Sequence, residues 1–496
     1  MNWIPFIVIV LYFFVLILVG FLTRRFSRTS TDFFIAGRNM GITLVTVSIV
    51  GEWLGGMSTI GTSEMAYQNG FFPLWYNVST AFGMFLFGLT MARYYRRNNA
   101  HTVGEMLENL YNRHTRVISS LAFIIAFIIL SFLQLKAIGS VMTVLFGIPF
   151  FWAVILSGII IFLYVYKGGM LSIAFTNLIH IILLYSTIII VFYIVFTRMG
   201  GYGGIFSRLA DQFQSEGMSA LEAGRMVSRY KNPMSLGISR VLAWLLGGIL
   251  SGFASQACIQ PVFSAKDIKT AKYSSILSAF LIAPLGLIIS TLGIAVRTGY
   301  FGPLEGFDPK NTLPFLLLDS RFFPPLLSGL ASAGIIAAIL STVAPVMFAI
   351  STILIKDFYH RIINEKADEA TLLRMSKRSV LLVCLITVPL AIFLEGGILE
   401  AAYITYGIRA SAAIVVISGI IFLDKRTNKS LIPGRAACYS ILVSTAGILI
   451  FVLFKRFFDR LLGIDIDKVY ISLALSILSL VLMSFLISRR TNHDIP

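Results

Sequence analysis

The segment VSIVGEWLGGMSTIG, residues 47–61, is apolar enough to lie within a membrane, yet it carries Gly51, Gly55 and Gly56 near its middle. Glycine is a poor helix former because it loses more backbone freedom on folding than any other residue. The segment therefore predicts a membrane-spanning helix that is interrupted halfway. The alternative is that Gly51 and Gly55, four residues apart, merely let two helices approach closely.

The rest of the chain is dominated by similar apolar segments. Hydrophobic residues make up 57% of the 496 residues and charged residues only 13%, about half of their share in ordinary soluble domains. Many runs reach the roughly 20 residues that a helix needs to cross a bilayer. We therefore predict an all-α polytopic membrane protein with about thirteen transmembrane helices, at approximately 4–22, 41–66, 71–95, 117–145, 149–167, 170–197, 236–262, 273–296, 324–357, 379–394, 397–423, 435–454 and 468–488.

A second span is interrupted in a corresponding place. The seventh predicted span contains AWLLGGILSGF, residues 243–253, with Gly247, Gly248 and Gly252. The second and seventh spans are five apart, as expected if spans 2–6 and 7–11 are inverted repeats. Interrupted helices at matching points of two repeats expose carbonyl groups and helix ends at the middle of the membrane, where transporters bind ions and substrates.

The net charge of +17 indicates orientation rather than nucleic-acid binding, because the basic residues lie in short connectors. If the N-terminus is outside and the C-terminus cytoplasmic, the inner connectors hold most of the 40 Lys and Arg residues. We thus expect an integral protein of the plasma (inner) membrane. The long outer loop 199–235 has helix-like patterning and is expected to lie along the membrane surface.

No motif indicates an enzyme or an ATP-driven pump. The five histidines are scattered without the H-E-x-x-H spacing of a metal site, and the chain has no G-x-x-x-x-G-K-[ST] phosphate-binding loop. The three cysteines, Cys258, Cys384 and Cys438, fall inside apolar runs and indicate buried hydrophobic positions rather than a disulfide framework.

The ninth span carries a candidate cation site. Ala338, Ser341 and Thr342 stand at i, i+3 and i+4 and therefore share one helical face. Two hydroxyls beside a carbonyl are oxygen ligands of the kind that hard cations prefer. The alternative is that both hydroxyls only bond back to carbonyls of their own helix.

Three charged residues lie in the middle of predicted spans: Glu52, Lys136 and Arg409. Charge at that depth is costly, so such residues face the interior, pair with one another and often mark a transport path. We expect an ion pair between Glu52 and Lys136, either static or involved in transport. Arg409 is a candidate anchor for a carboxylate, or a packing or gating residue. Trp53 offers a π face to a cationic solute or simply packs.

Five stretches together resemble the sodium/solute symporter family over roughly residues 30–430. They are FFIAGRNMG (33–41), GEWLGGMSTIGTSEMAYQNG (51–70), YVYKGGMLSIAFTN (164–177), QACIQPVFSAKDIKTAK (256–272) and AAILSTVAPVMF (337–348). The second of them is most similar to the choline-transporter branch of that family.

The resemblance implies a LeuT-like five-plus-five inverted repeat with an extra N-terminal helix. On this basis residues 1–30 form the leading helix and first loop, 31–430 the transport core, and 431–496 two further helices and a short tail. The resemblance also implies a sodium site made of backbone oxygens of Gly51, Leu54 and Ala338 and hydroxyls of Ser341 and Thr342.

Two departures from the family pattern narrow the expectation. Where members with a second sodium have an Asp, this chain has Asn177, and where they have serines it has Ala344 and Pro345. We therefore expect one sodium ion per cycle. Ser255 stands where choline carriers have an aromatic residue, so choline transport is not expected.

The sequence thus predicts a sodium-coupled symporter of a small organic solute that works by alternating access without ATP. The solute is expected to lie between spans 2, 4, 7 and 11, against Glu52, Trp53, Lys136, Gln256 and Arg409. Two alternatives remain: a proton-coupled transporter that uses Lys136 or Glu52, and a sensor that binds solute without moving it. A zwitterion, a carboxylate and a polar neutral solute all fit such a cavity.

Overall fold

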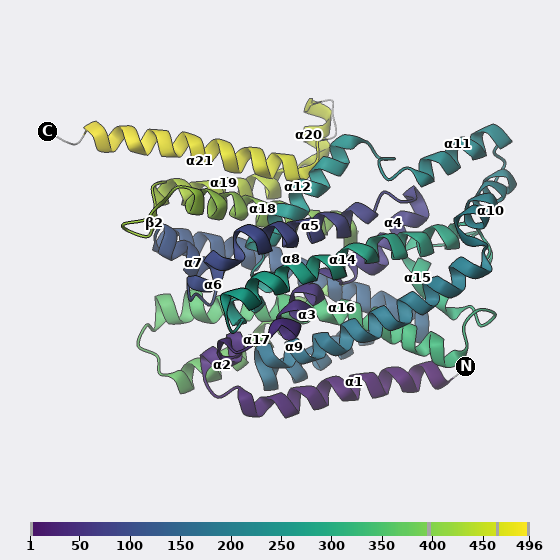
Figure 1. Ribbon diagram of the computed structural model, residues 1–496, viewed down its shortest axis with the longest axis horizontal. Coiled ribbons are helices and arrows are strands. Elements are labelled where there is room, and N and C mark those ends of the chain that lie inside the picture. The colour runs from purple at the N-terminus through teal and green to yellow at the C-terminus, as the bar shows by residue number, and fades with distance from the viewer. Residues whose placement is uncertain (1–2, 394–397, 463–465, 494–496) are drawn as a thin grey trace.

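A computed structural model describes residues 3–393, 398–462 and 466–493 of the 496-residue chain. Most of its long helices run along the longest axis of the molecule (Figure 1), as expected of a bundle that crosses a membrane. The start of α1 (Trp3–Thr23) and the end of α21 (Lys468–His493) lie at opposite ends of this bundle. The orientation in the membrane, with the N-terminus outside and the C-terminus cytoplasmic, stays a prediction from the basic connectors.

The helices between these two follow one another with short connections. They are α2 (Ser30–Ile35), α3 (Ile42–Trp53), α4 (Thr62–Asn69), α5 (Leu74–Thr90), α6 (Ala92–Arg97), α7 (Val103–Leu110), α8 (Arg113–Phe146), α9 (Phe150–Arg198), α10 (Gly201–Ser215), α11 (Ala220–Lys231), α12 (Ile238–Ala254), α13 (Gln256–Ser264), α14 (Ile268–Arg297), α15 (Thr312–Leu318), α16 (Pro325–Ile353), α17 (Glu369–Phe393), α18 (Ile398–Ile421), α19 (Gly434–Leu453) and α20 (Lys455–Leu462). Two strands, β1 (Leu423–Asp424) and β2 (Lys429–Ser430), pair antiparallel. Short 3-10 turns cover Arg24–Phe26, Ala36–Arg38 and Pro309–Asn311, and π-helical turns cover Met57–Gly61 and Leu354–Ile363.

Within the described residues, nine helices are long and apolar enough to cross a membrane, or up to eleven segments if each of two bent helix pairs counts as one span. The helix α9 covers two predicted spans, because Gly169 within it adopts φ 57° and ψ −142° and kinks it. The total of thirteen stays a prediction, and the predicted span ends at 394 and 397 lie outside the described residues. The loop 199–235 forms α10 and α11, as its patterning predicted.

The interruption predicted in the second span is present. The axes of α3 and of the helical segment after it differ by 57°, and Leu54 at the break has φ −91° and ψ 36°. Neighbouring helices leave room only for glycine here: a Cβ on Gly55 would lie 2.4 Å from Thr342 Oγ1, and one on Gly56 would lie 2.8 Å from Gln134 Oε1. The break therefore sits where α3 meets α16 and α8.

The position predicted for the other break is wrong. The helix α12 continues through Gly247, Gly248 and Gly252, and the 43° bend between α12 and α13 comes at Ser255, which has an extended φ −70° and ψ 107°. A Cβ on Gly248 would lie 2.2 Å from Ser79 Oγ. This glycine therefore serves the close packing of α12 on α5, which was the alternative meaning of such a motif.

The long helices pack as two groups around the breaks. The first group joins α3, α4, α5, α12 and α14, and the second joins α1, α8, α9, α16 and α17. The helix α3 also packs against α9 and α16, while α18 packs against both α12 and α8. The central helix is α16, since the most apolar stretch of this span is buried inside the protein throughout. The candidate site lies where the broken helices face α16 and α18.

Candidate functional site

Five oxygen atoms gather where the end of α3 meets α16. The Ser341 hydroxyl lies 3.0 Å from the Gly51 carbonyl oxygen and 2.7 Å from that of Ala338. The Thr342 hydroxyl lies 2.8 Å from the Gly51 carbonyl oxygen and 3.1 Å from that of Glu52. All of these groups are buried. The two hydroxyls therefore bond across to another helix, beyond the local bonds that the alternative interpretation allowed.

The carbonyls of α3 are free for this role because the helix ends there. The last four carbonyl groups of a helix have no partner within it. Leu54, the fifth predicted ligand, follows the last residue of α3 and is fully buried, and its amide donates to the Val50 carbonyl at 3.0 Å. The oxygens gathered here are neutral, which suits a small hard cation of low charge better than a transition metal.

A second cluster surrounds the buried carboxylate of Glu52. Its Oε1 accepts from Arg409 Nη1 at 2.9 Å and from Ser255 Oγ at 3.1 Å, and Arg409 Nη1 also lies 3.0 Å from Ser255 Oγ. The expected pair of Glu52 with Lys136 is therefore wrong: Arg409 on α18 takes that place. Lys136 lies on α8 and is partly exposed.

Aromatic rings enclose the guanidinium of Arg409. Its Cζ lies 5.4 Å from the centre of the Trp53 ring and 4.9 Å from that of Tyr406. Tyr406 in turn stacks on Tyr76 with ring centres 5.8 Å apart. The indole Nε1 of Trp53 donates to Cys258 Sγ at 3.3 Å. Residues from α3, α5, α13 and α18 and from the bend at Ser255 thus form one buried cluster that contains a carboxylate, a guanidinium and three aromatic rings.

Gln256, which we expected to face the solute, bonds in another direction. Its Oε1 accepts from the Val103 amide at 2.7 Å, and its Nε2 donates to the His101 carbonyl at 3.1 Å. The residue that touches Glu52 is its neighbour Ser255. Ser255 lies at the bend and Gln256 is the first residue of α13, so their side chains point in different directions and reach different partners.

A buried polar pair on α9 lies beside the oxygen cluster. The amide nitrogen of Asn177 lies only 2.3 Å from where a Cβ on Gly51 would be, so glycine at 51 makes room for it. Neither the amide atoms of Asn177 nor the ring nitrogens of His180 have a hydrogen-bond partner within the described residues. The His180 ring lies 5.9 Å from that of Tyr12. The number of sodium ions stays a prediction.

The sequence analysis did not predict a buried polar network just beyond the C-terminal end of α16. We call it the Asp357 network, and its members are Thr102, Glu108, Arg116, Ser120 and Asp357. Asp357 Oδ1 accepts from Thr102 Oγ1 at 2.7 Å and from Arg116 Nε at 2.8 Å, and Oδ2 accepts from Ser120 Oγ at 2.6 Å. Arg116 also pairs with Glu108 at 2.7 Å. The network ties α7 and α8 to the turn that follows α16.

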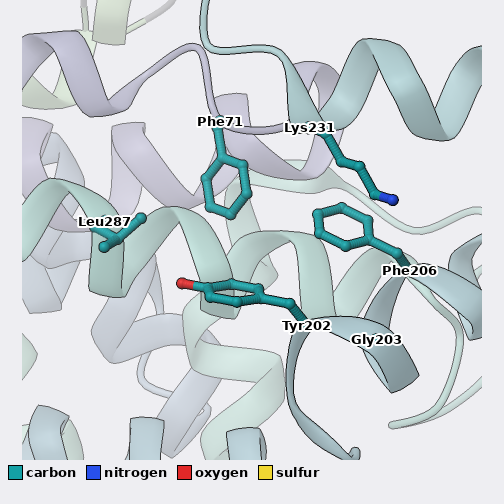
Figure 2. A pocket seen from close by; sticks show the side chains of 6 residues that line it. All are labelled: Phe71, Tyr202, Gly203, Phe206, Lys231 and Leu287. Atoms are coloured by element: carbon teal, nitrogen blue, oxygen red, sulfur yellow. The ribbon is translucent and has the colours of Figure 1, made fainter.

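A further pocket of about 500 Å³ is lined by residues of α10 and α11 among others (Figure 2). These two helices lie toward the end of the molecule where α1 begins (Figure 1). The lining of the pocket includes the rings of Phe71, Tyr202 and Phe206, which point toward one another from two elements. Lys231 Nζ lies 4.9 Å from the centre of the Phe206 ring. None of the predicted site residues lines this pocket, so it is separate from both clusters described above.

Comparison with known protein sequences places this arrangement in a family. The sequence pattern of the sodium:solute symporter family matches residues 33–435. A sodium/proline symporter of Staphylococcus aureus is 23% identical over 404 residues, which cover 79% of this chain and 75% of that protein. Sodium/proline symporter 2 of Staphylococcus saprophyticus is 24% identical over 405 residues, which cover 79% and 76%.

Solved structures show the same fold. A Na+-coupled sialic acid symporter in a substrate-bound, outward-open state superposes with a TM-score of 0.79 at 19% identity, over 98% of both chains. A nucleobase-cation-symport-1 family transporter in a closed conformation superposes with a TM-score of 0.57 at 13% identity, over 92% of this chain and 95% of that one. The expected LeuT-like fold is thereby confirmed.

Proposed function

Because this chain belongs to the sodium:solute symporter family, and is thus a sodium-coupled transporter of a small organic solute, we propose which residues bind the ion and the solute. One sodium ion binds between α3 and α16. Its ligands are the carbonyl oxygens of Gly51, Leu54 and Ala338 and the hydroxyls of Ser341 and Thr342.

The convergence of both hydroxyls on the Gly51 carbonyl supports this sodium site most directly, at 3.0 and 2.8 Å. Gly51 lies on α3 and Thr342 on α16, and these helices belong to the two packing groups described above. A cation held by both helices therefore links ion binding to their relative position, as coupling requires.

We propose that the solute binds at the buried cluster of Glu52, Trp53 and Arg409. Lys136 and Gln256 stay predicted lining residues in the same way. Proline and sialic acid, the solutes named for the relatives, both carry a carboxylate. This chemistry supports Arg409 as an anchor, because a guanidinium binds a carboxylate through two parallel hydrogen bonds.

The sodium site is tested by thermal unfolding of the purified protein in sodium chloride and in potassium chloride at equal ionic strength. A ligand that binds only the folded state stabilises it by about 2.7 kcal/mol when its concentration is a hundred times Kd. We expect a sodium-specific rise in Tm that the double variant Ser341→Ala/Thr342→Ala lacks.

The matched control is Ser275→Ala/Thr387→Ala. These two hydroxyls are also buried, but each donates to the carbonyl four residues earlier in its own helix. The control should keep the sodium response. A response that survives in the first double variant, or no sodium response in the parent, would contradict the proposed site.

The proposed stoichiometry rests on Asn177, Ala344 and Pro345, which provide neither a carboxylate nor hydroxyls for a second ion. Paired measurements of sodium and solute uptake in proteoliposomes should give one sodium ion per solute. A ratio of two would show that a second ion is bound elsewhere.

A further inference from the structure

Only one of the two oxygens of the Glu52 carboxylate has hydrogen-bond donors within the described residues. Its Oε1 has two donors, Arg409 Nη1 and Ser255 Oγ. Its Oε2 is buried and has no hydrogen-bond partner within the described residues. A buried carboxylate oxygen without a donor is unfavourable. The structure therefore leaves an open acceptor position for a donor that the described residues do not supply.

The guanidinium of Arg409 also has donor capacity left. Its Nη1 serves Glu52 and Ser255, and its Nε donates to the Thr405 carbonyl at 3.3 Å. Its Nη2 makes a single long contact of 3.5 Å to Thr405 Oγ1. An arginine has five N–H donors, so within the described residues Arg409 keeps a donor for a further acceptor.

Charge balance restricts which solutes can bind at the cluster of Glu52 and Arg409. Glu52 and Arg409 neutralise each other, and both side chains are only 1% exposed. A solute with a single charge would supply an opposite charge to only one of the two side chains when they separate, and a buried charge without a partner is costly. A neutral polar solute has hydroxyls that donate and accept, but it would not replace the opposite charge that each side chain loses when the pair separates. A zwitterion keeps the balance and brings one partner for each charged side chain.

We propose that the transported solute is a small zwitterion that inserts between Glu52 and Arg409. Its ammonium group binds Glu52 Oε2 beside the π face of Trp53, where a cation is attracted to the ring. Its carboxylate takes the Nη donors of Arg409 together with the Ser255 hydroxyl. The inference rests on the proposed solute site and adds the chemical class of the solute.

The test is a thermal-unfolding screen of the full chain in sodium chloride. The panel contains the twenty standard amino acids and glycine betaine, each with its carboxylate-only and amine-only analogue, and a set of neutral sugars. We expect at least one zwitterion to raise Tm and to lose at least ten-fold in apparent affinity when either charged group is removed. A monocarboxylate, an amine or a sugar acting in place of every zwitterion would overturn the inference, and so would a panel without any effect.

The variant Glu52→Gln gives a readout that a purely structural role would not change. The substitution removes the negative charge of Glu52 and leaves the positive charge of Arg409 in the cluster. We therefore expect the zwitterion to lose at least ten-fold in affinity while its carboxylate-only analogue gains, so that the order of preference reverses. The control Glu365→Gln, at an exposed residue, should keep the parent's preference.

Ser255→Ala provides a second variant if Glu52→Gln does not fold. It removes the hydroxyl shared by Glu52 and Arg409 and should weaken the zwitterion several-fold more than its amine-only analogue. An equal loss for both would count against carboxylate binding there. Sodium stabilisation of the parent without solute tests the ion site by itself, so failure of the zwitterion inference and failure of the sodium site remain distinguishable.

Discussion

The two buried carboxylates of this transporter, Glu52 and Asp357, pair with arginine in opposite ways. Both oxygens of Asp357 are occupied, by Arg116, Thr102 and Ser120. Glu52 uses one oxygen, for Arg409 and Ser255, and its other oxygen has no partner within the described residues. The first carboxylate has donors on both oxygens, whereas the second keeps one acceptor oxygen that no described residue fills.

This difference separates structural from functional ion pairs in an apolar protein. A fully bonded buried carboxylate holds helices in one arrangement, because any movement breaks several strong contacts at once. A partly bonded carboxylate lowers the stability of the protein without ligand. A ligand that donates to the free oxygen removes this loss. The number of unused acceptor positions is therefore more informative than burial, which is nearly equal at both sites.

The comparison predicts unequal costs for two matched amide substitutions. In Asp357→Asn the amide NH2 replaces an acceptor that faces a donor, and Arg116 keeps only Glu108 as a counter-charge. We expect the free energy of unfolding to fall by about 3–5 kcal/mol. In Glu52→Gln the NH2 can take the open Oε2 position, where no donor faces it. Although Arg409 also loses its counter-charge, the loss should be smaller by about 1–3 kcal/mol because this clash between donors is avoided.

Both variants can be measured by denaturant unfolding of the purified protein in one detergent, with Glu365→Gln as the exposed control. The control should change the unfolding free energy by less than about 1 kcal/mol. Equal losses in the two buried variants would mean that the open position of Glu52 has no energetic consequence.

A second prediction concerns the glycine that allows α3 to approach α16. In Gly55→Ala the new methyl group would lie 2.4 Å from Thr342 Oγ1 and displace that hydroxyl. We expect a loss of about 1–3 kcal/mol, typical of overpacking, and a weaker sodium-dependent rise in Tm. Gly224→Ala is the control, because nothing lies within 4 Å of its Cβ position. A full sodium response in Gly55→Ala would argue against Thr342 as a ligand.

The smallest effect is expected at an exposed carboxylate outside the membrane. Hydrogen bonds from Arg297, at 2.6 and 2.7 Å, lower the pKa of Glu216 below its ordinary value. A lowered pKa means that the contribution to stability is present above the unfolded value of about 4.3 and is lost as the pH falls through the folded value. Because the carboxylate lies at the surface, with its side chain 34% exposed, we expect less than about 1 kcal/mol.

Tm measured between pH 6 and pH 3 checks this prediction. The parent should lose slightly more stability on acidification than Glu216→Gln, in which the titration is absent. Identical curves would show that the pair contributes nothing, and a large difference would place Glu216 with the buried carboxylates rather than with exposed ones.

Much of the fold could be predicted from the sequence because membrane helices and glycine breaks leave a local pattern. The break near Gly55 was predicted because several glycines interrupt an apolar segment there. The structure adds that these glycines also make room for α16 and α8. The break at Ser255 was missed, because serine gives no comparable signal and the nearby Gly248 drew attention to a position where it serves packing. Local composition cannot distinguish a glycine that bends a helix from one that lets helices touch.

Less of the site could be predicted, because contacts between distant helices depend on rotation about each helix axis. Glu52, Lys136 and Arg409 were identified as interior charges, but which two of them pair is set by helix orientation and not by spacing. Asp357 and Arg116 lie near the ends of predicted spans, where charges are normally assigned to connecting loops. Only the three-dimensional arrangement shows that Asp357 is fully buried.

The shared acceptor at Gly51 has a consequence for turnover. A hydroxyl rotates freely to suit its surroundings, so Ser341 and Thr342 can offer lone pairs to sodium or protons to the Gly51 carbonyl. When the ion departs, the same atoms satisfy one another, and the vacated site needs no rearrangement of the backbone. If the proposed sodium site is correct, the empty carrier can complete its return step without first binding another ion, because the same oxygens that hold sodium also satisfy one another without it.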